Sequence, residues 1–166
     1  MRPPFGVESG DVLFCRHLVA HIAEPGAAFA AWTLLARPGA RLIVQETETI
    51  ASDHPVLARY YECVAAMQAR HGQQLRIGAH LEAALARTPW RMEHSAVRAL
   101  LLDPRLMARI HVMNLRTWRH DPAAIALFDT AALDELDLGL SAIAEGATHC
   151  AAVRNELREI VARLQA

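Results

Sequence analysis

The fold is decided by residues 11–46, which read D-V-L-F-C-R-H-L-V-A-H-I-A-E-P-G-A-A-F-A-A-W-T-L-L-A-R-P-G-A-R-L-I-V-Q-E. Two short apolar runs lie at its ends. Asp11 to Cys15 opens with an acidic residue, and Arg41 to Gln45 has β-branched character and is followed by Glu46. Short apolar runs of this length are typical of buried strands.

The segment between these two runs has the features of a helix. Pro25 occupies a position suited to the first turn, and Phe29, Trp32 and Leu35 form a stripe at helical spacing. The run Arg37–Gly39 then ends the helix, because proline fixes one turn residue and glycine supplies a positive φ. Two strands joined by a helix predict a right-handed parallel βαβ unit, which normally lies within a larger sheet.

Periodicity and helix caps predict the remaining elements. Residues 1–10 and Thr47–Asp53 are expected to be loops. We expect helices over His54–Arg70, Gly78–Arg87 and Asp103–Trp118, a short helix starting at Asp121-Pro122, a helix from Asp129 or Thr130 through Ile143, and a strand over Trp90–Leu102.

The C-terminal segment fits two structures. Val153, Leu157, Ile160 and Leu164 have helical spacing, whereas a strand over Leu157–Arg163 would help to close the sheet. We favour the strand, because the sheet otherwise has little to close it.

Composition restricts the class of protein. The chain has 166 residues, of which 53% are hydrophobic, enough for one compact domain. A net charge of −1 argues against a nucleic-acid or membrane-surface partner held by bulk electrostatics. No apolar signal region or run of membrane-spanning length is present, and three cysteines without metal-ligand spacing indicate a reducing cytoplasm.

The order of several residues resembles the second half of the class I, Rossmann-like, S-adenosylmethionine-dependent small-molecule methyltransferases, which include the ubiquinone and menaquinone methyltransferases. The match consists of Asp11, Arg16, His21-Ile22, Pro25, the turn Arg37-Pro38-Gly39-Ala40 and Glu46. It continues weakly through His54-Pro55, Ile77-Gly78 with Leu81, and Glu159–Arg163.

The resemblance implies an α/β fold: a partial Rossmann-like sheet, with strands equivalent to 4-5-7-6, helices on both faces, and a helical lid over residues 47–89. It implies S-adenosylmethionine as the cofactor. The family's glycine-rich loop and the acidic residue ending its second strand have no counterpart here. Since that loop lets backbone approach the ligand closely, we expect this chain to bind the cofactor poorly alone.

The resemblance also implies site residues at the carboxyl ends of the first two strands. Cys15, Arg16, His17 and His21 are candidates for a partial cofactor site, and His17 and Glu46 for catalysis. A histidine there could take a proton from the methyl acceptor. His21 could instead be a structural residue at a helix start. Glu46 could cap a helix or pair with arginine, and Glu48 is expected to be solvated.

Two weaker hypotheses concern metals and substrate. His17 and His21 would share a face if Arg16–Ala23 were helical, but no third ligand has an interpretable spacing, so we predict no metal site. Tyr60, Tyr61, His80, His111 and Trp118 could line a substrate pocket beneath the lid. Amphipathic packing explains each of them without a function, and for Tyr60 and Tyr61 we favour that explanation.

The expected sheet order leaves the strand Asp11–Cys15 as an unprotected apolar edge, and such edges pair with something. Its partner could be another chain supplying the missing half-sheet, a second copy, or the first ten residues. Three functions follow. The chain could be a methyltransferase subunit or fragment acting on a small molecule, a non-catalytic accessory or scaffolding subunit, or a small-ligand or metal-binding protein.

Overall fold

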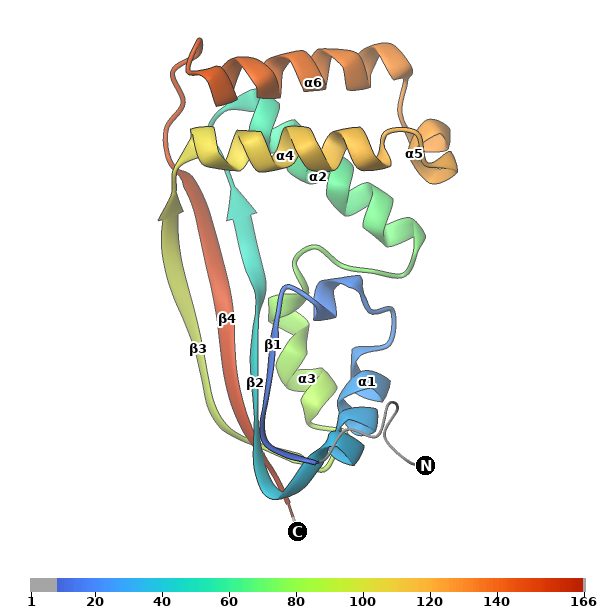
Figure 1. Ribbon diagram of the computed structural model, residues 1–166, viewed down its shortest axis with the longest axis vertical. Helices are drawn as coiled ribbons and strands as arrows, with labels where there is room; N and C mark the ends of the chain where they lie inside the picture. Colours follow the sequence, from blue (N-terminus) through green and yellow to red (C-terminus); the bar gives the residue numbers. More distant parts are fainter. Residues whose placement is uncertain (1–8, 166) are drawn as a thin grey trace. The chain divides into compact units, whose positions relative to one another are not determined.

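The structure, a computed structural model, describes residues 9–165 (Figure 1). Apart from Ser9 and Gly10, the loop expected over residues 1–10 lies outside the described residues. The elements are β1 (Gly10–Arg16), η2 (Val19–His21), α1 (Pro25–Trp32), η3 (Thr33–Leu35), β2 (Ala36–Ala51), α2 (Pro55–Arg70), η4 (Ile77–His80), α3 (Leu81–Leu85), β3 (Trp90–Leu102), α4 (Pro104–Trp118), α5 (Pro122–Leu127), α6 (Thr130–Glu145) and β4 (Val153–Leu164), where η marks a 3-10 turn.

The four strands form one sheet in the order β1-β2-β4-β3. β1 and β2 are parallel, with Val12 beside Arg41 and Arg16 beside Gln45, as the predicted βαβ unit requires. The C-terminal segment is a strand between β2 and β3, so the helical alternative is wrong. This is the spatial order expected from the resemblance, while the equivalence of each strand to a family strand stays a prediction.

β2 is longer than expected and contains an irregularity. It runs from Ala36 to Ala51, so the loop predicted over Thr47–Asp53 is wrong for most of its length. Ile50 is 8% exposed, so the added part of the strand includes a buried apolar side chain. The expected turn at Arg37–Gly39 is a bulge within β2: Gly39 has φ +82°, and the register with β1 jumps between its first two pairs.

The described residues form two compact units. Among the described residues, unit 1 contains residues 9–48, 73–98 and 156–165. Its core joins alternate side chains of β2 and β4, such as Leu42 and Ile160, to Phe29 of α1 and Leu81 of α3. The indole N–H of Trp90 donates to the Phe29 carbonyl oxygen at 2.8 Å. In this unit the described helices pack on one face of the sheet, rather than on both faces as expected.

The other face of the sheet in unit 1 is polar. Glu93 of β3 accepts bonds from Arg41 of β2 at 3.2 Å and from Arg163 of β4 at 2.6 Å. Farther along, Glu159 accepts a bond from Gln45 at 2.8 Å and pairs with Arg98 at 3.3 Å. Alternation of apolar and charged residues along β2 and β4 therefore separates a packed face from a solvated one.

Unit 2 contains residues 49–72 and 99–155 and is mainly helical. α4 and α6 lie alongside each other (Figure 1). The predicted helix starts are confirmed for the described residues: His54, Asp103, Asp121 and Asp129 each accept a bond from the amide two residues on. None of the described helices is long and apolar enough to cross a membrane. The expectation of a single domain stays a prediction.

Candidate functional site

The candidate site lies in unit 1 at the carboxyl end of β1, where the pairing of β1 with β2 stops at Arg16 and Gln45. The backbone N–H of His17 donates to the Gln45 carbonyl oxygen at 3.0 Å, which extends the ladder one residue beyond β1. His17 has φ +49°, the left-handed conformation that residues other than glycine rarely adopt. The chain therefore turns sharply away from the sheet at the residue that the sequence singles out as a candidate base.

Glu46 holds the loop that follows this turn. Its side chain is 0% exposed, and Oε1 accepts hydrogen bonds from the backbone N–H groups of Leu18 and Val19, both at 2.7 Å. These bonds cap η2, which has no side-chain cap of its own. Oε2 of Glu46 is also buried and has no hydrogen-bond partner among the described residues. In the structure, Glu46 thus caps a helical turn, which is one of the roles that the sequence left open for it.

Burial and the charge of Glu46 set the protonation of the two neighbouring groups. Burial, reinforced by the carboxylate of Glu46, raises the pKa of the Cys15 thiol to about 11, so Cys15 is a neutral thiol at pH 7. Burial lowers the pKa of the His17 imidazole, while the charge of Glu46 opposes that shift. His17 is therefore neutral near pH 7 and able to accept a proton.

The predicted cofactor residues other than Cys15 are exposed. Arg16 is the last residue of β1, and His21 ends η2. The helix assumed over Arg16–Ala23 is wrong: only Val19–His21 form a 3-10 turn, so His17 and His21 do not share a helical face. Among residues 9–165, no group of three or more His, Cys, Asp or Glu side chains is arranged to hold a metal ion.

The residues predicted to contact substrate are divided between the two units. In unit 2, Tyr60 and Tyr61 are 2% exposed and His111 6%. His111 stacks on Tyr60 with 4.2 Å between ring centroids, and its Nε2 lies 3.1 Å from the Tyr61 hydroxyl oxygen. Trp118 lies 6.4 Å from Tyr60. This cluster is part of the interior of unit 2. His80 is exposed and belongs to unit 1.

Sequence reasoning missed a charged network around Glu48. Arg158 of β4 binds the Glu48 carboxylate through two nitrogens, at 2.7 and 3.0 Å, and donates to Glu82 at 3.1 Å. The side chains of Glu48 and Arg158 are 16% and 18% exposed, so the expectation that Glu48 is solvated is wrong. The partner is 110 residues away in the sequence, and no local pattern indicates it.

The loops that directly follow the strands contain no glycine in the part of the chain that the structure describes. β1 is followed by His17 and Leu18, β2 by Ser52 and Asp53, and β3 by Asp103. A backbone cradle for a nucleotide-like ligand needs glycine for close approach. The residues present can supply part of a ligand site at the carboxyl end of β1, without such a cradle.

Comparisons with known proteins relate this chain to solved structures. No family model matches the sequence, and no curated protein matches it. The [4+2]-cyclase SpnF matches 99% of this chain at 13% identity with a TM-score of 0.50, and the chain spans 53% of SpnF. A candidate methyltransferase of Bacillus halodurans (TM-score 0.49, 13% identity) is covered to 74% of its length by 99% of this chain.

The mycolic acid cyclopropane synthase CmaA1, solved with S-adenosylhomocysteine, matches 94% of this chain at 14% identity with a TM-score of 0.49, and 56% of its own chain is covered. Identities at this level show the fold alone. The chain has a mixed α/β fold with a four-stranded sheet, and the likeness to SpnF concerns this fold alone.

Proposed function

We propose that this chain is part of an S-adenosylmethionine-dependent methyltransferase that acts on a small molecule, with a cofactor site completed by another polypeptide chain. One observation carries the proposal: the buried Glu46 carboxylate of β2 holds the amides of Leu18 and Val19 just beyond the carboxyl end of β1. Ligands of open α/β sheets bind outside the carboxyl ends of the strands. The subtype closest to the ubiquinone and menaquinone methyltransferases rests on the sequence resemblance.

In this proposal His17 is the base and Glu46 is a positioning residue. When bound, the cofactor supplies a methyl group on a positively charged sulfur, already activated for transfer. His17 accepts the proton that the acceptor's hydroxyl or amine loses as its new bond to carbon forms. Glu46 keeps the loop bearing His17 in place, because its Oε1 is occupied by two amides. Arg16 and His21 would contact the cofactor at the same strand end.

β1 and its surroundings support the need for a partner. β1 lies at one end of the strand order and pairs with β2 alone. Val12 is 58% exposed and Phe14 62%. Beside this edge, a cavity of about 320 Å³ is lined by apolar side chains that include Leu13, Leu18 and Trp32. A strand added to β1 would satisfy the free backbone groups, and its side chains would fill this cavity.

The partner in this proposal is a chain, different from or identical to this one, that supplies the missing half-sheet and a glycine-rich loop. The alternative that residues 1–10 cover the edge concerns residues that lie mainly outside the described part of the chain. A non-catalytic accessory subunit is the second candidate function, favoured by the absence of glycine from the described loops that follow the strands.

Titration with S-adenosylhomocysteine, followed by NMR of the ¹⁵N-labelled chain, tests the proposal. Millimolar ligand is expected to shift the amide signals of Arg16 to Val19, because the part of the site that this chain supplies remains. The mass in solution, determined in the same buffer, shows whether copies associate. The variant Glu46→Gln should alter these shifts, whereas Glu24→Gln, the same change at an exposed position of unit 1, should leave them unchanged.

Two outcomes decide between the candidate functions. Shifts confined to the Arg16–Val19 loop support a methyltransferase site, and micromolar affinity in an oligomer would show that copies of this chain complete it. A folded sample without shifts in that loop overturns the proposal and favours the accessory subunit.

A further inference from the structure

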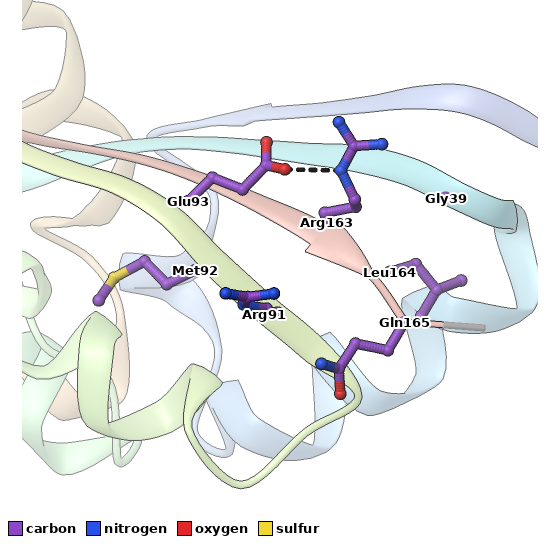
Figure 2. Close-up of a pocket in the computed structure, with 7 residues that line it drawn as sticks. All are labelled: Gly39, Arg91, Met92, Glu93, Arg163, Leu164 and Gln165. Carbon is purple, nitrogen blue, oxygen red and sulfur yellow. Dashed lines mark hydrogen bonds and ion pairs between the residues drawn. The ribbon is translucent and has the colours of Figure 1, made fainter.

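A second cavity lies in unit 1 near the start of β2, at Gly39, away from His17 and Glu46. It has a volume of about 760 Å³ and is lined by Gly39 of β2, by the first residues of β3 and by Arg163, Leu164 and Gln165 (Figure 2). The backbone N–H of Gln165 donates to the Pro89 carbonyl oxygen at 3.2 Å, which holds the end of β4 beside the start of β3. Nothing in the proposed methyl transfer uses this region.

The charges around this cavity are mainly positive. Arg91 and Arg163 line it, and Arg41 shares the carboxylate of Glu93 with Arg163. Three arginines and one glutamate leave a local formal charge of +2 in a chain whose net charge is −1. Like charges on neighbouring strands are destabilising unless an anion lies near them. The Glu93 carboxylate is one such anion, and it forms ion pairs with Arg41 and Arg163.

Arg91 is the residue without an internal counterion. It is exposed, and it takes part in none of the ion pairs among residues 9–165. Figure 2 shows Arg91 and Gln165 at the neighbouring ends of β3 and β4, with the bond between Arg163 and Glu93 farther along the sheet. A guanidinium group and a side-chain amide next to a cavity offer several N–H donors with no carboxylate assigned to them.

We propose that this cavity binds a small molecule through an oxyanion group, a phosphate or a carboxylate. Arg91 is the principal donor, because its planar guanidinium can bind two oxygens at once. Gln165 adds an amide donor, and Arg163 supplies positive charge that Glu93 partly offsets. Because the Glu93 carboxylate already pairs with Arg41 and Arg163, its negative charge weakens the binding of another anion at this site. This site is independent of the proposed methyl transfer.

Isothermal titration of the full chain at low ionic strength tests the site with two probes, inorganic pyrophosphate for phosphate and citrate for carboxylate. Arg91→Gln is expected to weaken binding about fivefold or more, because a charge-assisted donor is lost. Glu93→Gln is expected to tighten binding several-fold, because Arg41 and Arg163 lose their shared counterion. Arg109→Gln, which removes the same charge from an exposed position of α4 in unit 2, is the matched control.

The outcomes distinguish a specific anion site from nonspecific electrostatic attraction of the probes to exposed arginines. Opposite effects of Arg91→Gln and Glu93→Gln, with Arg109→Gln unchanged, support the proposal, and the probe that binds tighter identifies the oxyanion. Absence of binding to both probes overturns it. Equal losses in Arg91→Gln and Arg109→Gln also overturn it, because the attraction would then be nonspecific. Circular dichroism spectra that match the parent chain exclude misfolding as the cause of a loss.

Discussion

Oε1 of Glu46 lies 2.7 Å from the backbone nitrogen of Val19, so that a fully buried carboxylate of β2 holds the loop that follows β1. The same oxygen lies 2.7 Å from the Leu18 nitrogen. Glu46 therefore satisfies two backbone donors that would otherwise lack an acceptor at the start of η2.

Replacement of Glu46 tests this role through stability. Glu46→Leu leaves both amides without an acceptor and is expected to lower the free energy of unfolding by about 3 kcal/mol. Glu46→Gln keeps a carbonyl oxygen and loses the charge, with an expected cost of about 1 kcal/mol. Urea denaturation measures both. Equal stability of the Gln and Leu variants would contradict the two-amide role, and Glu24→Gln is the exposed control.

The left-handed backbone of His17 predicts an unusual ranking of substitutions. His17→Gly should be more stable than His17→Ala by about 1 kcal/mol, because glycine adopts a positive φ without strain. Both variants lose the imidazole, so under the proposed function both should lose methyl transfer. Thermal unfolding of the two variants gives the comparison. A more stable alanine variant would contradict the backbone conformation.

The ion pair between Arg158 and Glu48 predicts that the stability of the fold depends strongly on both residues. Arg158→Met leaves the Glu48 carboxylate mostly buried without its counterion and should cost about 3 kcal/mol. The double variant with Glu48→Gln should lose less than the sum of the single changes. Arg154→Met removes an exposed ion pair to Asp53 and should cost under about 0.5 kcal/mol. Additive effects of the two changes at Glu48 and Arg158 would contradict the pairing.

His111 predicts a loss of stability in mild acid. Burial lowers its pKa from 6.5 to about 4, so the unfolded chain binds a proton on His111 between these values and the folded chain does not. The contribution of neutral His111 to the free energy of unfolding is fully present above pH 6.5. It is lost as the pH falls toward 4, a total decrease of about 3 kcal/mol. Denaturation across this range should show a shallower dependence for His111→Phe. Parallel curves would contradict the buried neutral imidazole.

The edge of β1 predicts association. Phe14→Lys places a charge on an apolar strand at the end of the sheet and should weaken any oligomer, because charged side chains disfavour strand pairing at edges. Light scattering after gel filtration measures the mass. Met113→Lys, at an exposed position of α4, is the control. A parent chain that is monomeric at all concentrations would contradict self-association, leaving a different chain as the partner to seek.

Local signals predicted most of the fold. The proline and aspartate starts of α4 and α5, the bounds of β3, and the positive φ at Gly39 all depend on a few neighbouring residues and were predicted correctly. The extension of β2 through Thr47 to Ala51 was missed. Its polar residues look like a loop in sequence, whereas in the structure they continue the strand and Ile50 is buried.

The sequence by itself determined the parallel pair of β1 and β2, the helix caps, and the residues that gather at the strand ends. Only the tertiary structure decided what Glu46 and Glu48 do, because their partners are backbone amides 27 and 28 residues away and an arginine 110 residues away. It also decided that Tyr60 and His111 stack in the interior of unit 2. Caps and turns depend on adjacent residues, whereas burial and charge pairing depend on segments that only folding brings together.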